Sequence, residues 1–215
     1  MALCAVLALV SAADAATDEE KCLAGRAKAK GKFEQCIQTV LSKSYGASPL
    51  DQAGIAKCVA SYDAAWVKLQ KLTDSTSCVG ERITDDGVTF TDRLTGLVWE
   101  KKTDLGDQHD IDNGYNLNFS GTDDGSAYSI FLKALNDAAF GGAHAWRLPA
   151  ASELLTLVNQ TIPGGDTGAR YWTTTVSQSD ASRALTVRRD GFAGFLIEAT
   201  EKFGAQYVRA VRGGF

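Results

Sequence analysis

The chain has 215 residues, of which 45% are hydrophobic and 22% are charged, and its formal net charge is −4. This composition is typical of a folded globular protein and excludes a disordered or collagen-like chain. The mildly acidic balance argues against a nucleic-acid-binding protein, because neutralising phosphates requires clustered lysine and arginine. With only two histidines, a multi-histidine metal site is not expected.

Residues 1–15 are predicted to be a signal peptide. Residues 2–10 form an uncharged apolar run, about half of the ~20 residues that span a bilayer. The following sequence Ala13-Asp14-Ala15 fits the small-residue rule for cleavage before Ala16. A short buried helix is the alternative. Removal of this segment would take Cys4 with it and leave an exported chain without a membrane span.

Two helices are predicted next, over residues 21–41 and 48–72. The first is rich in alanine, lysine, leucine and glutamine, which favour helix. The second begins at Ser48-Pro49, where a serine N-cap precedes a first-turn proline. Its apolar side chains recur at helical spacing, at Ile55, Val59, Tyr62, Trp66 and Leu69. Residues 16–79 are therefore expected to form a helical hairpin.

Four cysteines, Cys22, Cys36, Cys58 and Cys78, remain in the exported chain, and an even number favours disulfides. Along one helix Cys22 and Cys36 lie roughly 21 Å apart, whereas a disulfide needs Cα atoms within about 7 Å. An antiparallel hairpin instead allows Cys36–Cys58 near the turn and Cys22–Cys78 at the open end. Zinc and redox sites need closer cysteine pairs than these. In the chain-entropy model each bridge contributes roughly 3 to 4 kcal/mol.

Residues 80–215 are expected to form a second, cysteine-free domain. Residues 79–215 carry 13 basic and 18 acidic side chains, a net charge of −5, whereas residues 22–78 carry 8 basic and 4 acidic, a net charge of +4. Strands are predicted at 88–90, 97–100, 171–175, 184–188, 195–199 and 207–211, and helices at 126–139 and 152–159. Strands around two helices without a βαβ alternation indicate an α+β domain.

Six motifs occur in order across residues 85–214. They are FTDRLTGLVWE (90–100), LKALN (132–136), WRLP (146–149), EL (153–154), YWTT (171–174) and VRAVRGG (208–214). This set resembles the DUF1566 family, also called the Lcl C-terminal domain family. The resemblance implies an α+β fold related in architecture to C-type lectins and formylglycine-generating enzymes. It also implies a surface adhesin that binds sulfated glycans, although the acidic domain lacks the positive field which such ligands require. The preceding helical region resembles an accessory region found beside such domains in exported bacterial proteins.

The chain departs from the family pattern at three places. Ala145 stands where the family usually has aspartate before WRLP, and Ala150 stands where a serine or threonine cap commonly follows the proline. Thr173-Thr174 replaces a serine pair. The first change removes a polar contact from any site that this segment helps to form.

The motif residues are expected to support the fold. Large aromatic side chains supply much of a small core, so Trp99, Trp146 and Trp172 are predicted to be buried; the alternative is that tryptophans and tyrosines such as Tyr171 and Tyr207 stack on sugars. Arginines of the motifs are expected to pair with carboxylates such as Glu153 or Asp92. The motif residues with a predicted structural role are Trp99, Trp146, Arg147, Pro149, Glu153, Trp172, Arg209 and Arg212.

An acidic stretch is the most suggestive local feature for binding. Residues 103–132 contain six aspartates and no lysine or arginine. Oxygen ligands on a loop rich in glycine and asparagine suit Ca²⁺, so Asp107, Asp110 and Asp112 are candidate ligands. The segment matches only a fragment of an EF-hand, and a solvated acidic loop, with His109 in solvent, explains it equally well.

No catalytic constellation is evident. Formylglycine-type oxidation requires a cysteine that residues 79–215 lack, and no serine lies in a G-x-S-x-G motif. His144 is expected in a loop or a partly buried structural position. The expected function is therefore non-catalytic binding or adhesion at the cell surface or in the periplasm, with a glycan or a protein as partner. The alternatives are a self-assembling structural subunit and a polysaccharide hydrolase using Asp110 and Asp112 as acid and base.

Overall fold

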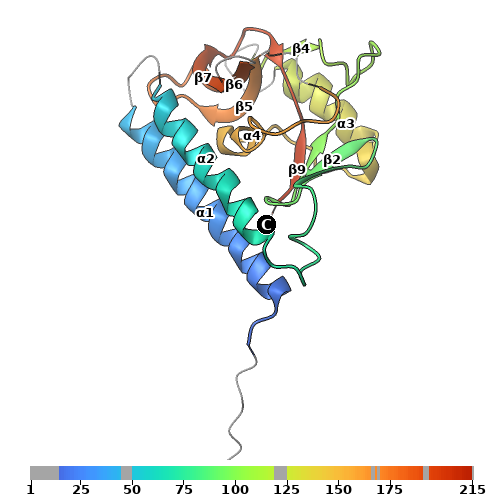
Figure 1. Cartoon of the computed structure of the whole chain (residues 1–215). Helices are drawn as coiled ribbons and strands as arrows, with labels where there is room; N and C mark the ends of the chain where they lie inside the picture. Colours follow the sequence, from blue (N-terminus) through green and yellow to red (C-terminus); the bar gives the residue numbers. More distant parts are fainter. Residues whose placement is uncertain are drawn as a thin grey trace, which may run out of the picture.

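The computed structural model describes residues 15–44, 50–118, 125–165, 168, 170–190 and 194–214. A helical hairpin lies along one flank of a domain built from two sheets and short helices (Figure 1). The predicted α+β class is confirmed. The predicted signal peptide falls almost entirely on residues 1–14, outside the described residues.

Two helices, α1 (Asp18–Lys43) and α2 (Gln52–Leu69), form the hairpin. α1 begins with a capping box, in which the Thr17 hydroxyl accepts from the Glu20 N–H and the Glu20 carboxylate accepts from the Thr17 N–H. The predicted serine cap of α2 is wrong. Ser48 lies outside the described residues, and Asp51 is the N-cap because its carboxylate accepts from the Gly54 N–H at 2.8 Å.

The two disulfides have the nested arrangement that the hairpin requires, one joining α1 to α2 and the other joining α1 to the segment that follows α2. Cys22 pairs with Cys78, with a Cα–Cα distance of 6.0 Å, and Cys36 pairs with Cys58 at 5.8 Å. The first bridge closes the open end of the hairpin and the second lies towards the turn. The Cys36–Cys58 bridge therefore fixes the register of α1 against α2, and the Cys22–Cys78 bridge ties the start of α1 to the segment after α2.

The described residues of the domain form two separate sheets. The four-stranded sheet is antiparallel in the order β1 (Ile83–Asp85), β2 (Thr89–Asp92), β3 (Leu97–Glu100), β9 (Val211–Gly213). The five-stranded sheet has the order β4 (Gly114–Tyr115), β8 (Gln206–Tyr207), β5 (Arg170–Val176), β6 (Arg183–Asp190), β7 (Gly194–Glu201), and only β5 and β8 run parallel.

One predicted strand is divided between the two sheets. Residues 207–211 were expected to be continuous, but β8 ends at Tyr207 and β9 begins at Val211. Between them the Ala210 N–H donates to the Glu100 carboxylate at 3.0 Å. A side chain thus replaces the ladder partner at this point, and the strand crosses from one sheet to the other.

The helices of the domain differ from their predictions mainly at their ends. The helix expected at 126–139 begins as a π-helical segment, η1 (Ala127–Leu132), and continues as α3 (Lys133–Asp137). A short 3₁₀ turn, η2 (Phe140–Gly142), follows. The helix expected at 152–159 is α4 (Ala151–Leu155), after which the chain continues in turns.

The three motif tryptophans are buried, as predicted. Trp99 belongs to a hydrophobic cluster that also includes Phe33, Ile37 and Ile55 of the hairpin. Trp146 and Trp172 belong to a second cluster inside the domain, where their indole N–H groups donate to backbone carbonyls. The first cluster shows that the hairpin and the domain share one apolar core.

A buried arginine joins the hairpin to the domain. Arg82 donates from Nε and Nη2 to the two Asp92 oxygens, both at 2.9 Å, and from Nη1 to Asp63 of α2 at 2.6 Å. Nη2 also donates to the Thr156 carbonyl after α4. The side chains of Arg82 and Asp92 are 4% and 0% exposed, so each charge depends on the other for compensation.

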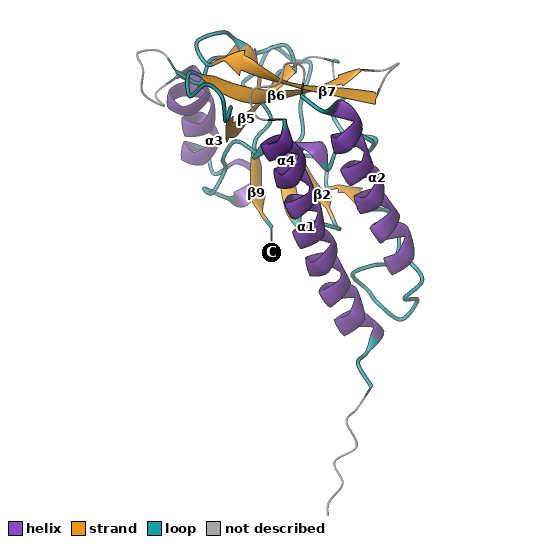
Figure 2. Ribbon diagram, turned by 90° about the vertical axis from the view of Figure 1, so that its left-hand side faces the viewer, coloured by secondary structure: helices purple, strands orange, loops and turns teal. Residues whose placement is uncertain are grey.

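The hairpin also covers an edge of the five-stranded sheet. The Gln52 amide donates to the Ile197 carbonyl at 2.7 Å, and its oxygen accepts from the Ile197 N–H at 3.0 Å. Figure 2 shows the first turn of α2 beneath β7, which is the edge strand. The side chain therefore occupies the backbone groups that an unprotected edge would offer to another chain.

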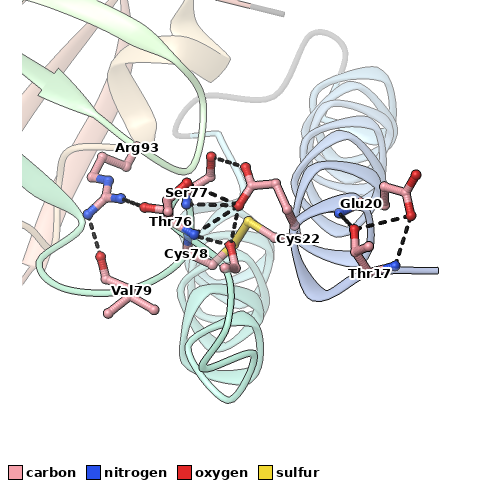
Figure 3. Close-up of a disulfide and its surroundings, with 10 residues drawn as sticks. Thr17, Glu20, Cys22, Thr76, Ser77, Cys78, Val79 and Arg93 are labelled. Carbon is pink, nitrogen blue, oxygen red and sulfur yellow. Dashed lines mark hydrogen bonds between the residues drawn. A yellow bond between two sulfur atoms is a disulfide. The ribbon is translucent and has the colours of Figure 1, made fainter. Parts of the chain in front are cut away.

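At the open end of the hairpin, Glu19 holds the segment before Cys78. Figure 3 shows this segment, with Thr76 and Ser77 beside the Cys22–Cys78 disulfide. Its carboxylate accepts from the side chains of Ser77 and Ser75 and from the backbone N–H groups of Ser77 and Thr76. These hydrogen bonds, led by that of the Ser77 hydroxyl, lower the pKa of Glu19 to about 2. The Cys22–Cys78 disulfide is thus supported by an ionised carboxylate.

Replacing Arg82 by methionine is predicted to destabilise the protein by about 3–5 kcal/mol, because Asp92 would remain buried without its cation. Chemical denaturation of both proteins measures this difference. Arg183→Gln is the control, since it breaks exposed ion pairs with Asp180 and Glu201 and should cost less than about 1 kcal/mol. Equal small losses in the two variants would contradict the assigned role of Arg82.

The lowered pKa of Glu19 predicts an acid-dependent loss of stability. Its contribution is complete above the ordinary pKa of 4.5 and disappears as the pH falls towards about 2. Glu19→Gln should therefore lower the thermal midpoint at pH 6 and have progressively less effect between pH 4.5 and 2. Glu34→Gln, at an exposed position of α1, should leave the profile unchanged. A Glu19→Gln effect that is the same at every pH would refute the prediction.

Candidate functional site

A buried charged group forms the base of the candidate site. Glu100, at the end of β3, is fully buried, and the side chain of Lys102 is 1% exposed. Glu100 Oε1 accepts from Lys102 Nζ at 3.0 Å and lies 2.9 Å from His109 Nδ1, while Oε2 accepts from the Ala210 N–H. Burial lowers the pKa of Lys102 despite the neighbouring carboxylate. The carboxylate is thus surrounded by donors, as burial requires.

The prediction that His109 lies in solvent is wrong, because its side chain is only 19% exposed. Its imidazole stacks on Phe140 with ring centroids 4.0 Å apart, and its Nδ1 lies 2.9 Å from Glu100 Oε1. Lys102 Nζ lies 4.6 Å from the centroid of the Phe131 ring. The contacts of His109 with Phe140 and with the buried Glu100 carboxylate thus hold the loop that carries His109 against the domain.

The loop over residues 103–113, which we call the acidic loop, is held in one shape by its own side chains. Asp107 accepts from the Thr103 hydroxyl at 2.7 Å and from the His109 N–H at 2.8 Å. Asp110 accepts from the N–H groups of Asp112 at 2.8 Å and Gly106 at 2.6 Å. These backbone donors, led by that of Asp112, lower the pKa of Asp110.

Three carboxylates of the acidic loop come together. Carboxylate oxygens of Asp104, Asp110 and Asp112 lie within 4.8 Å of one another. Asp104 and Asp112 are exposed, whereas Asp110 is buried. Of the predicted ligands, Asp110 and Asp112 are in this group, whereas Asp107 is turned into the loop and Asp104 takes its place. Asp123 and Asp124 lie outside the described residues.

The loop also presents an apolar side chain. Leu105 is 79% exposed and lies between Asp104 and a glycine in the left-handed conformation, Gly106. Leu105 was not predicted as a binding residue, because a single leucine in a polar segment gives no sign of its exposure. Glu100 and Lys102 were missed as well, since nothing local distinguishes a buried charge pair from surface charges.

The lowered pKa of Asp110 argues against its use as a general acid. A catalytic acid needs a pKa raised towards the working pH, whereas the backbone donors stabilise the Asp110 carboxylate. His144, the second histidine, is exposed in a loop, and its Nδ1 lies 2.5 Å from the Asn136 carbonyl. The lowered pKa therefore leaves Asp110 unsuited to the general-acid role that the hydrolase alternative would give it.

The motif arginines have three different environments. Arg147 forms the predicted ion pair with Glu153, with contacts of 2.6 and 2.7 Å. The Asp92 pairing predicted for these arginines is wrong, because Arg82 occupies that carboxylate. Buried Arg209 donates to the Glu100 and Gly165 carbonyls, and Arg212 lies 5.2 Å from the Trp146 ring centroid.

Comparison of the sequence with models of known protein families identifies the family of this chain. The model of the Lcl C-terminal domain matches residues 88–212. The chain belongs to the Lcl C-terminal domain family. No curated protein and no solved structure gives a significant match. Two disulfides are consistent with the extracytoplasmic setting of a surface-type family. In the part of the chain that the structure describes, every helix is too short or too polar to cross a membrane.

The Lcl domain compensates for the alanine after its WRLP motif. Ala150 has no hydroxyl to cap α4, but the Ala151 N–H donates to Thr175 Oγ1 of β5 at 2.9 Å. The Ala150 N–H donates to Glu153 at 2.8 Å, and the carbonyl of Pro149 accepts from the Thr174 N–H, also at 2.8 Å. A neighbouring strand thus supplies the cap that the family usually places in the helix.

Calcium binding by the acidic loop stays a prediction. Asp104, Asp110 and Asp112 offer only oxygen ligands, which suits a hard cation. Millimolar Ca²⁺ should raise the thermal midpoint, and Asp112→Asn should abolish the rise, because that substitution removes an exposed carboxylate from the group. Asp137→Asn, which removes an exposed carboxylate of α3, should preserve it. An unchanged midpoint with Ca²⁺, together with no heat of binding, would reject the prediction.

Proposed function

We propose that this protein is an exported, non-catalytic binding or adhesion protein of the cell surface or periplasm. Its partner, a glycan or a protein, would be engaged by the acidic loop of the Lcl domain. The observation that carries the proposal is the geometry of this loop. Side-chain-to-backbone hydrogen bonds fix its shape, while Asp104, Leu105 and Asp112 remain exposed.

A loop of fixed shape is favourable for binding because little conformational entropy remains to be lost on association. An exposed apolar side chain flanked by carboxylates also combines an anchor with groups that give specificity. The base of the loop is fixed by the contacts of His109 with Glu100 and Phe140. These features support a recognition surface placed on a rigid domain.

The partner chemistry follows from charge and from the burial of the tryptophans. Trp99, Trp146 and Trp172 are at most 4% exposed and offer no face to a sugar ring. A glycan would therefore be held by carboxylate hydrogen bonds to its hydroxyl groups. The net charge of −5 over residues 79–215 favours a neutral or cationic partner over a sulfated one.

Self-assembly is the second candidate, and a charge asymmetry favours it. Residues 22–78 have a net charge of +4, opposite in sign to the Lcl domain. Complementary charges of this kind increase association rates between copies. In this alternative the acidic loop would meet the hairpin of a neighbouring copy.

A glycan array probed with three proteins tests the proposal. Wild type should bind a limited set of neutral or cationic glycans, and the Leu105→Ser/Asp112→Asn variant should lose binding by at least about tenfold, roughly 1.4 kcal/mol. Ile130→Ser is the control, because Ile130 is also exposed but lies in η1.

Three outcomes distinguish the candidates. Loss of array binding in the loop variant alone supports recognition by the acidic loop. Equal binding by the loop variant and wild type would refute it. Concentration-dependent sedimentation of wild type, abolished in the loop variant and accompanied by no array signal, would assign the loop to self-assembly.

A further inference from the structure

A groove between α1 and α2 has the features of a ligand site. Its volume is about 280 Å³, close to the lower limit for small-molecule sites in proteins. Phe33 and Tyr62 form its floor and are 4% and 3% exposed. Small side chains at Ala29 and Ala65 leave the space between the helices open.

The groove is bounded at both ends. At one end Gly25 and Leu69 are in close contact, since a Cβ at Gly25 would lie 2.4 Å from Leu69 Cδ2. At the other end lies the Cys36–Cys58 disulfide. Eleven residues of α1 separate these ends, which corresponds to about 16 Å along the helix. A groove of this length suits one small molecule rather than a long polymer.

The groove opens away from the Lcl domain. Lys30 and Glu34 of α1 lie beside Ser152 and Glu153 of the domain. Successive helical residues are rotated by about 100°, so a residue two positions from Lys30 lies on the opposite face. Lys28 and Lys32, which line the groove, are both two positions away. The groove is thus separate from the acidic loop.

Three lysines surround the apolar floor. Lys28, Lys32 and Lys68 are exposed, and within the described part of the chain their ammonium groups form no ion pair or hydrogen bond. No aspartate or glutamate lines the groove. Lys28 and Lys32 are four residues apart on one helix face, an arrangement in which like charges destabilise the helix. An anion bound between them would remove this repulsion.

We propose that the groove binds a single-chain amphiphilic anion, namely a medium-chain fatty carboxylate such as dodecanoate. Its alkyl chain would lie on Phe33, Tyr62 and the Cys36–Cys58 disulfide, and its carboxylate would accept hydrogen bonds from the lysines. The apolar floor provides the hydrophobic contact and the ammonium groups provide charge complementarity. This activity is additional to the recognition proposed for the acidic loop and uses different residues.

Calorimetric titration of the intact exported chain with dodecanoate, below its micelle concentration, tests the proposal. One saturable site is expected. Lys28→Gln/Lys32→Gln should weaken binding at least about tenfold, because two of the three cations are removed. Lys57→Gln is the matched control, since Lys57 is an exposed lysine of α2 that does not line the groove. Ala65→Phe, which fills the groove, should abolish binding while circular dichroism remains native.

Two further probes separate the contributions of chain and charge. Dodecyltrimethylammonium has the same chain with a cationic head, and acetate has the same head without the chain; neither should bind. Absence of dodecanoate binding to the folded protein would overturn the proposal. So would equal binding of the cationic amphiphile, equal binding of acetate, or an affinity for dodecanoate that the lysine substitutions leave unchanged.

Discussion

The guanidinium of Arg82 connects three segments that are distant in sequence: Asp63 in α2, Asp92 at the end of β2, and the Thr156 carbonyl after α4. A buried arginine without these acceptors would carry a large desolvation cost. The hairpin and the domain must therefore be in place together before this charge is compensated. The shared apolar cluster and the hydrogen bonds between Gln52 and Ile197 also join the hairpin to the domain. The hairpin is thus packed as part of the fold rather than attached by a linker.

A second buried charge, Glu100, also joins segments that are distant in sequence. The Glu100 carboxylate accepts from Lys102 and Ala210 and contacts His109, so that the end of β3, the segment before β9 and the acidic loop meet at one carboxylate. The loop is consequently fixed from beneath, while its exposed residues remain available to a partner. The two proposed recognition surfaces lie on different parts of the molecule. One is an acidic loop on the Lcl domain and the other is a basic, apolar-floored groove on the hairpin.

Local regularities made the hairpin predictable from the sequence. The rise of a helix excludes a bridge between Cys22 and Cys36, and short β-rich runs such as 97–100 mark strands that the structure confirms. Features that depend on distant partners were not predictable. The division of residues 207–211 between two sheets results from a bond between Ala210 and the Glu100 side chain. Asp104, rather than Asp107, joins the carboxylate group because hydrogen bonds turn Asp107 into the loop. Arg82 has no local pattern that indicates its burial.

Amide hydrogen exchange of the intact protein tests most directly whether the hairpin and the Lcl domain unfold together. If Arg82 and the shared core couple them, the slowest amides of α2 and of β6 should exchange through the same global opening. They should then show equal opening free energies and the same dependence on denaturant. A markedly smaller opening free energy for α2, with β6 still protected, would show that the hairpin unfolds independently and would contradict the account.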